Sequence, residues 1–167
     1  MIEQTCCFTG HRPKKLPFKS NEADERCVKL KEILCNEIQK LITEKGVNHF
    51  ISGMAIGTDI ICAEIVLDMK KEYDIVLECA IPCRNQNEKW NKKQKERYSN
   101  LIHQADIVTC LQEEYTRGCM QKRNKYMVDN SQYVIAVWDG SKSGTFNTLK
   151  YARKLKRNIM VIDTKIL

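Results

Sequence analysis

Short apolar runs alternate with longer amphipathic segments along the whole chain, and this alternation constrains the fold more than any other feature of the sequence. Apolar residues recur every three or four positions in the longer segments, which predicts helices over residues 21–45, 58–71, 87–103, 119–129 and 143–156. The short runs, typical of strands, cover residues 4–8, 48–52, 75–81, 106–111, 133–138 and 158–163. Regular alternation of strand and helix predicts an α/β fold with a mainly parallel sheet and helices on both faces.

Length and composition indicate a globular protein that folds without disulfide bonds. The 167 residues are enough for one domain, which we expect to span residues 1–167. No apolar run reaches the length of about 18 residues that suggests a membrane span, and the first residues lack the features of a signal peptide. We therefore expect a cytoplasmic protein whose nine cysteines are reduced and mostly buried. No CxxC pair occurs and the three histidines are scattered, so we predict no metal site, and we predict no cofactor.

The formal net charge of +7 favours an anionic partner. The basic residues are spread over several segments, and most of them are expected to lie on solvated helix faces. The charge fits a phosphorylated small molecule and a nucleic acid equally well.

Small residues follow three of the predicted strands, at the edge of the sheet where ligands bind in parallel α/β folds. Glycine lets the backbone approach a ligand closely, and free N–H groups at the next helix start favour a phosphate. Strand-to-helix turns also favour Gly, Ser and Thr for purely structural reasons. The glycines are Gly10 after the first strand, Gly53 and Gly57 after the second, and Gly140 and Gly144 after the fifth.

Two standard nucleotide-binding motifs are missing. The second loop has the pattern GxxxG without a lysine, so it is not a Walker A loop, and no GxGxxG occurs. ATP hydrolysis and NAD-dependent hydride transfer are therefore not expected.

Charged residues beside these loops have both a structural and a functional interpretation. Asp59 could cap the helix that follows Gly57, or it could accept hydrogen bonds from ribose hydroxyls next to a phosphate. Arg12 directly follows the first strand, so it could bind phosphate or face solvent, and His11 could contact a neighbouring loop or a ligand. Arg123 lies among lysines on a predicted helix, and its spacing alone predicts a surface charge.

Three stretches resemble the YpsA-like branch of the SLOG superfamily, which takes its name from the Smf/DprA and Lonely guy proteins. They are TGHR at residues 9–12, SGMAIGTD at 52–59, and KRNKYMVDNSQYVIAVWDGSKSGTFNTLKYA at 122–152. The resemblance implies a Rossmann-like, three-layer α/β/α sandwich and a homodimer or larger homo-oligomer. It also implies that a nucleotide or nucleotide-derived ligand, such as an ADP-ribose or NAD derivative, binds at the glycine-rich loops. The implied ligand-binding residues are Thr9, Gly10, His11, Arg12, Ser52, Gly53, Gly57, Thr58, Asp59, Arg123, Asp139, Gly140, Ser143, Gly144 and Thr145.

The resemblance to the Lonely guy branch is incomplete at one position. Those enzymes cleave the N-glycosidic bond of nucleoside 5′-monophosphates and carry an RKxxM stretch followed by PGGxGTxxE. Arg123 matches the arginine of the first stretch, but Thr148 stands where the second has its glutamate. Cleavage of a glycosidic bond builds positive charge on the ribose, which a carboxylate stabilises and a threonine does not. Asp59, Asp139 or Glu113 are the carboxylates that could substitute from other loops.

Three functions are consistent with these features. The first is binding of a nucleotide-derived ligand by a sensor or sequestering protein, and the second is a phosphoribohydrolase that uses a relocated carboxylate. The third is binding of single-stranded DNA, for which Trp90, Tyr98 and Tyr115 are the candidate stacking residues. We place nucleic acid after a small molecule as the expected partner, and we expect no membrane contact.

Overall fold

The computed structural model describes residues 2–167 and contains a six-stranded sheet in which all neighbouring strands are parallel. The order across the sheet is β4-β3-β2-β1-β5-β6. This arrangement confirms the predicted Rossmann-like α/β fold. The strands are β1 (Thr5–Gly10), β2 (His49–Ser52), β3 (Val76–Ile81), β4 (Ile107–Cys110), β5 (Tyr133–Trp138) and β6 (Asn158–Asp163).

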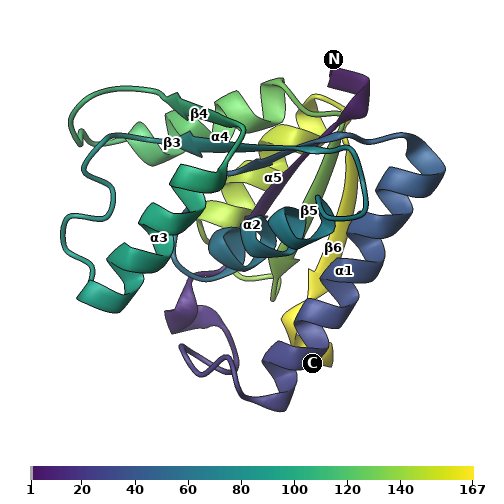
Figure 1. Ribbon diagram of the computed structural model, residues 1–167, viewed down its shortest axis with the longest axis horizontal. Coiled ribbons are helices and arrows are strands. Elements are labelled where there is room, and N and C mark those ends of the chain that lie inside the picture. The colour runs from purple at the N-terminus through teal and green to yellow at the C-terminus, as the bar shows by residue number, and fades with distance from the viewer. Residues whose placement is uncertain (1) are drawn as a thin grey trace.

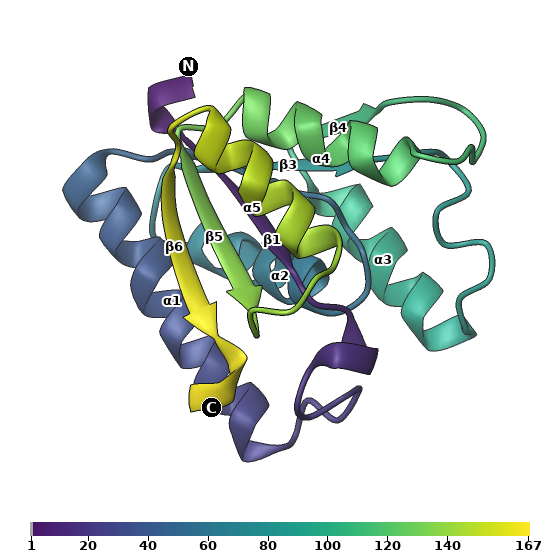
Figure 2. The ribbon, with the colours of Figure 1, turned by 180° about the vertical axis from the view of Figure 1, so that it is seen from behind.

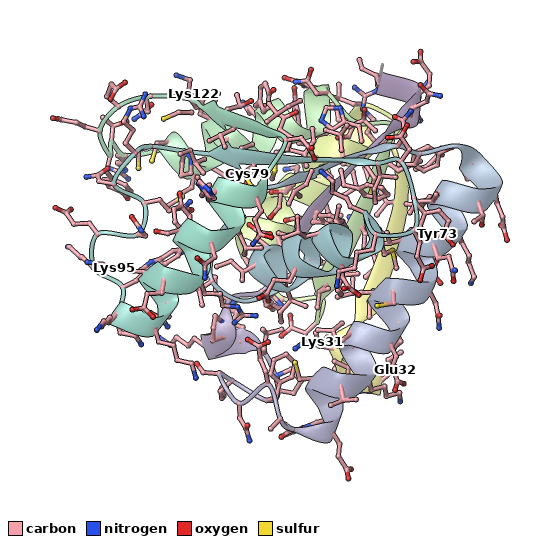
Figure 3. The ribbon with its side chains drawn as sticks, viewed as in Figure 1. Lys31, Glu32, Tyr73, Cys79, Lys95 and Lys122 are labelled. Atoms are coloured by element: carbon pink, nitrogen blue, oxygen red, sulfur yellow. The ribbon has the colours of Figure 1, made fainter. Side chains whose placement is uncertain are left out.

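Helices cover both faces of the sheet. Figure 1 shows α1, α2 and α3 on the near face, and Figure 2, the reverse view, shows α4 and α5 on the other face. Charged side chains cover the outer surfaces, as Lys95 on α3 and Glu32 on α1 illustrate, whereas Cys79 is buried (Figure 3). The helices are α1 (Glu25–Lys45), α2 (Thr58–Met69), α3 (Lys92–Gln104), α4 (Cys119–Asp129) and α5 (Gly144–Lys154), with short 3₁₀ helices at Ile2–Gln4, Pro13–Lys15 and Thr164–Ile166.

The two faces of the sheet have separate apolar cores because successive side chains of a strand point in opposite directions. Cys6 and Phe8 of β1 belong to the core under α1, α2 and α3. Cys7 belongs to the smaller core under α4 and α5. On the first face, the rings of Phe8 and Phe50 stack with centroids 6.0 Å apart. Central strands are therefore buried on both sides, which explains their nearly continuous apolar sequences.

Several predicted boundaries differ from those in the structure, and three of them have an identifiable cause. The first helix begins at residue 25 instead of 21, because the side chain of Asp24 caps it by accepting a hydrogen bond from the Arg26 N–H. The third helix begins at residue 92 instead of 87, because Asn91 and Gln94 form a capping box. The first strand continues to Gly10 instead of ending at residue 8, since it pairs with β5 up to Val137.

The nine cysteines all lie within residues 2–167 and are free thiols, and seven of them are buried. No helix in this part of the chain is long and apolar enough to cross a membrane. Met1, which the predicted domain includes, lies outside the described residues.

The chain reverses direction across the sheet after β4, and the switch point lies between β1 and β5. From β1 it builds β2, β3 and β4 on one side, and it then crosses to β5 and β6 on the other side. Ligands of open α/β sheets bind beyond the carboxyl ends of the strands at such a switch point. The loops after β1, β2 and β5 therefore gather where the sequence predicts the site.

Candidate functional site

A cavity of about 110 Å³ lies beyond the carboxyl end of β1. Its walls come from β1 and the loop after it, the β2–α2 loop, and the N-terminal parts of α4 and α5. Seven of the predicted residues line it: Thr9, Gly10, Arg12, Asp59, Arg123, Gly144 and Thr145. The other eight are not among the described residues that line it: His11, Ser52, Gly53, Gly57, Thr58, Asp139, Gly140 and Ser143.

Arg123 places a buried positive charge against this cavity. The residue is only 3% exposed, so the surface position that its spacing predicts is wrong. Its guanidinium donates from Nη1 to the carbonyl oxygen of Gly53, and from Nε to Oδ1 of Asn124 at 2.8 Å. Burial lowers the pKa of Arg123, while the negative charge of Asp59 acts in the opposite direction. None of the ion pairs formed by residues 2–167 includes Arg123.

Two of the predicted glycines leave room for side chains of the protein itself. A Cβ on Gly53 would lie 2.6 Å from Nη1 of Arg123, and a Cβ on Gly10 would lie 2.5 Å from the side chain of Thr58. Cβ atoms essentially never come closer than 3.0 Å to another heavy atom. Gly53 therefore makes the buried position of Arg123 possible, and Gly10 does the same for Thr58.

Gly57 joins the loop after β1 to the start of α2. Its φ of 99° lies in the left-handed region, and a Cβ there would lie 2.8 Å from the carbonyl oxygen of His11. That same carbonyl accepts hydrogen bonds from the N–H of Thr58 at 3.3 Å and from its Oγ1 at 2.9 Å. The backbone of the loop after β1 therefore fills the bend between β2 and α2.

The loop after β5 is also held to the loop after β1. His11 is 3% exposed, and its Nε2 lies 2.8 Å from Oδ1 of Asp139. The backbone N–H of Ser141 donates to the same Oδ1 at 2.9 Å. Hydrogen bonds from Ser141, together with the contact to His11, hold the pKa of Asp139 well below its usual value. His11 and Asp139 therefore position two walls of the cavity without lining it.

Asp59 is the only carboxylate among the described residues that line the cavity. It is 7% exposed, and its Oδ2 accepts a hydrogen bond from the N–H of Ala55 at 3.3 Å. Its backbone carbonyl accepts a hydrogen bond from Oγ of Ser52 at 2.7 Å. The N-cap position of α2 is occupied by Gly57, so Asp59 is not the cap. Burial raises the pKa of Asp59, while the nearby charge of Arg123 opposes this shift.

The N-terminus of α5 forms the remaining wall. Ser143 caps the helix by accepting a hydrogen bond from the N–H of Phe146 at 3.2 Å. A Cβ on Gly144 would meet no described atom within 4 Å, so the cavity is open to the backbone there. The first N–H groups of a helix have no acceptor within the helix, and they carry partial positive charge. Gly140, with a φ of 89°, lies in the turn before this helix.

Thr148, which stands where the Lonely guy enzymes have a glutamate, is not among the described residues that line the cavity. Thr148 is 2% exposed, and its Oγ1 donates to the carbonyl oxygen of Gly144 at 3.0 Å. Glu113 accepts a hydrogen bond from Nε of Arg84 at 2.7 Å, and neither residue belongs to the described lining. Of the three carboxylates considered as substitutes, only Asp59 lines the cavity.

Five lining residues were not predicted, and helical spacing could have identified one of them. Once Arg123 is taken to face inward, Met120, three positions before it, lies on the same face of α4. Within residues 2–167, no group of three or more His, Cys, Asp and Glu side chains is arranged to hold a metal ion. The additional lining residues are Phe8, Ala55, Met120, Gln121 and Asn124.

A second polar cluster lies under α4, outside the cavity. Glu78 of β3 is 3% exposed, and its carboxylate accepts hydrogen bonds from the hydroxyl groups of Tyr126 at 2.7 Å and Thr109 at 2.9 Å. Nε2 of His49 lies 2.8 Å from its other oxygen. Burial favours a higher pKa for Glu78, but the contacts with His49, Tyr126 and Thr109 outweigh it, and the pKa is lowered.

Comparison with known proteins identifies relatives over most of the chain. The YpsA family model, described as "YspA SLOG family", matches residues 6–165. The SPbeta prophage-derived protein YoqJ of Bacillus subtilis is 37% identical over 140 residues, which cover 76% of this chain and 82% of that protein. A UPF0398 protein of Staphylococcus epidermidis is 26% identical over 145 residues, which cover 85% of this chain and 76% of that protein.

Two solved structures share the fold. DNA processing protein A from Helicobacter pylori, described for its single-stranded DNA binding mode, superposes with a TM-score of 0.66 at 18% identity. The match covers 96% of this chain and 65% of that one. DNA processing protein A from Streptococcus pneumoniae gives a TM-score of 0.62 at 17% identity, covering 94% of this chain and 49% of that one. This chain therefore spans between about half and two thirds of their length.

The family match spans all three stretches on which the predicted resemblance depends, and the curated relatives cover most of the same residues. This chain therefore belongs to the YpsA family of SLOG proteins.

Proposed function

We propose that this protein binds a nucleotide-derived ligand, such as an ADP-ribose or NAD derivative, by holding a phosphate in the cavity, and that it acts as a sensor or sequestering protein. The buried charge of Arg123 carries the proposal. A buried guanidinium is costly unless its charge is compensated. Arg123 has two oxygen acceptors, and the charge of Asp59 lies nearby, but none of the described ion pairs places an anion directly on it. Arginine pairs well with phosphate oxygens because its planar group offers two parallel donors.

Three further features of the cavity support a phosphate. Arg12 lines the cavity from the loop after β1 and adds a second positive charge. Gly144 and Thr145 present the N-terminus of α5, which favours an anion. The volume of about 110 Å³ is small beside the roughly 300–1,000 Å³ of sites that enclose a whole small molecule. The cavity therefore suits one group of a ligand rather than the entire molecule, and Asp59 can accept hydrogen bonds from an adjoining ribose.

Calorimetry with inorganic phosphate, AMP and ADP-ribose tests the proposal. Arg12→Ala is expected to weaken binding of all three by about 10- to 150-fold, the value of a hydrogen bond to a charged group. Lys14→Ala is the matched control, because it removes one positive charge from the same loop at an exposed residue that is not among the described lining. Absence of heat with every ligand, or equal losses in the two variants, would contradict the proposal.

A phosphoribohydrolase is a second candidate, and the position of Asp59 favours it over other enzymes. A buried carboxylate with a raised pKa can act as a general acid or base near a bound nucleotide. Chromatography would then detect free base released from AMP by the natural protein and not by Asp59→Asn. If purine and pyrimidine monophosphates remain intact after long incubation, this candidate is excluded.

Single-stranded DNA is a third candidate, supported by the net charge of +7 and by the single-stranded DNA binding of the Helicobacter pylori protein that shares the fold. Fluorescence anisotropy with a labelled oligonucleotide tests it. DNA binding through phosphates predicts an affinity that falls steeply between about 50 and 200 mM salt. An affinity that salt hardly changes would argue for a small-molecule site.

Pairing of two copies also remains a proposal. Edge strand β6 leaves Met160 42% and Val161 38% exposed, and an apolar edge of a sheet can associate with another copy. Analytical ultracentrifugation would show a dimer in the natural protein and a monomer in Val161→Lys. A monomer in both would contradict the proposal.

A further inference from the structure

We infer that a second pocket, next to the cavity, holds the base of the nucleotide whose phosphate occupies the cavity; this inference rests on the proposed function. The pocket has a volume of about 330 Å³ and lies between the segment that precedes α3 and the loop that precedes α4. Met120 lines both the pocket and the cavity, so the two hollows are neighbours. Together they offer a small charged compartment and a larger one beside it.

Aromatic side chains make the larger pocket suitable for a planar base. Tyr115 lines it and is 60% exposed, so its ring is accessible to a ligand. Trp90 also lines it, and its ring meets the ring of Tyr98 edge-on, with centroids 5.3 Å apart and planes at 89°. Trp90 is thus held in place by packing, whereas Tyr115 is free to stack on a ligand. Bases stack on such rings whatever their identity, because every base has a π-face.

The charges around the pocket fit a base better than a second phosphate. Glu88 and Lys89 both line it and carry opposite charges, so neither sign dominates. Asn85 brings a side-chain amide, which can donate to and accept from the polar edge of a base. The phosphate compartment, in contrast, contains two arginines and one carboxylate.

One hydrogen-bond acceptor connects the two compartments. The carbonyl oxygen of Gly53 accepts a hydrogen bond from Nη1 of Arg123 and a longer one, of 3.4 Å, from Nε2 of Gln86. The guanidinium that faces the phosphate and the amide that lines the base pocket are therefore anchored at the same backbone atom. A nucleotide that enters both compartments would contact both anchored groups at once.

A comparison of AMP with ribose 5-phosphate tests the inference by calorimetry, because the two differ only by the base. AMP is expected to bind more tightly. Tyr115→Ala is expected to weaken the binding of AMP by about 5- to 150-fold, which is the effect of removing one stacking ring. The same variant is expected to leave the affinity for ribose 5-phosphate unchanged. Tyr115→Phe keeps the ring and is expected to keep the affinity for AMP.

Fluorescence gives a second readout that does not depend on truncating Tyr115. The chain has two tryptophans, so Trp138→Phe leaves Trp90 as the sole reporter of the pocket. AMP is expected to quench this emission, and ribose 5-phosphate is expected to leave it unchanged. An oligonucleotide and its abasic counterpart, titrated in the same way, distinguish a base in a DNA strand from a free nucleotide.

Different experimental results would refute this inference and the proposed function. The base pocket is refuted, and the phosphate site is retained, if AMP and ribose 5-phosphate bind equally tightly and Arg12→Ala weakens both. In that case Tyr115→Ala changes the affinity for neither compound. If neither compound nor inorganic phosphate binds, both proposals are overturned.

Discussion

Replacing Gly53 by alanine tests whether the buried position of Arg123 depends on the absence of a single methyl group. The added Cβ would lie 2.6 Å from Nη1, 2.7 Å from Cζ and 2.9 Å from Nε of Arg123. The φ of Gly53 is outside the left-handed region, so alanine brings no backbone strain of its own. The guanidinium, at the end of a flexible side chain, must move away and lose its hydrogen bond to the carbonyl of residue 53.

The expected cost follows from two opposing contributions. Loss of a hydrogen bond by a charged group costs about 1.5–3 kcal/mol. Alanine in place of glycine restricts the unfolded chain and returns about 0.4–1 kcal/mol. Gly53→Ala is therefore expected to lower the free energy of unfolding by about 0.5–2.5 kcal/mol. Phosphate affinity should fall by about 10-fold or more, because the displaced guanidinium no longer faces the cavity.

A double-mutant cycle separates this mechanism from a general loss of stability. Urea unfolding is measured for the natural protein, Gly53→Ala, Arg123→Ala and the double variant. Without the guanidinium the methyl group meets no clash at these atoms, so Gly53→Ala should be neutral or slightly stabilising in the Arg123→Ala background. The coupling energy should then be at least about 1.5 kcal/mol. Free energies that add within about 0.5 kcal/mol, or a phosphate affinity that Gly53→Ala leaves intact, would refute the reasoning.

Two further predictions concern stability. Gly57→Ala should lower the melting temperature clearly. Its φ of 99° alone costs about 1–3 kcal/mol for alanine, and the clash of the added Cβ, 2.8 Å from the carbonyl oxygen of His11, adds to this cost. Gly144→Ala, whose Cβ meets no described atom within 4 Å, should change the melting temperature little, and equal effects of the two variants would contradict this. The pKa of Glu78 is lowered in the folded state, so its contribution is present above its unfolded pKa and is lost as pH falls through its folded pKa. Tyr126→Phe should therefore cost about 1–3 kcal/mol in urea unfolding at about pH 7 and less once the pH falls below the lowered pKa of Glu78, and a cost independent of pH would count against this.

The fold could be predicted from the sequence because local signals dominate it. Each strand and helix is marked by its own periodicity, and Gly46 ends α1 in the left-handed conformation as expected of a C-terminal glycine. The largest errors lie at two helix starts, where the capping groups of Asp24 and Asn91 decide the boundary. Such caps depend on side-chain hydrogen bonds that apolar periodicity does not reveal.

The site could be predicted only in part, because its details depend on contacts between distant segments. The sequence predicts the loops after three strands, and six residues of these stretches line the cavity together with Arg123 of α4. The sequence does not show that Gly53 makes room for Arg123, since the two residues are seventy positions apart. The role of Glu78 is hidden in the same way, because the mostly apolar run at 75–81 predicts a strand and does not reveal the partners of the carboxylate buried in it. Its partners come from two neighbouring strands and a helix.

Two side chains within one turn of α4 attach this helix to other parts of the fold. Arg123 reaches the carbonyl of Gly53 at the cavity, and Tyr126 reaches the carboxylate of Glu78 inside the sheet. Rotation of the helix about its long axis would break both hydrogen bonds. Each hydrogen bond therefore helps to keep the other side chain in its orientation. A variant that removes the Tyr126 hydroxyl is thus expected to loosen the orientation of the guanidinium, so that stability near neutral pH and the proposed affinity for an anion decline together.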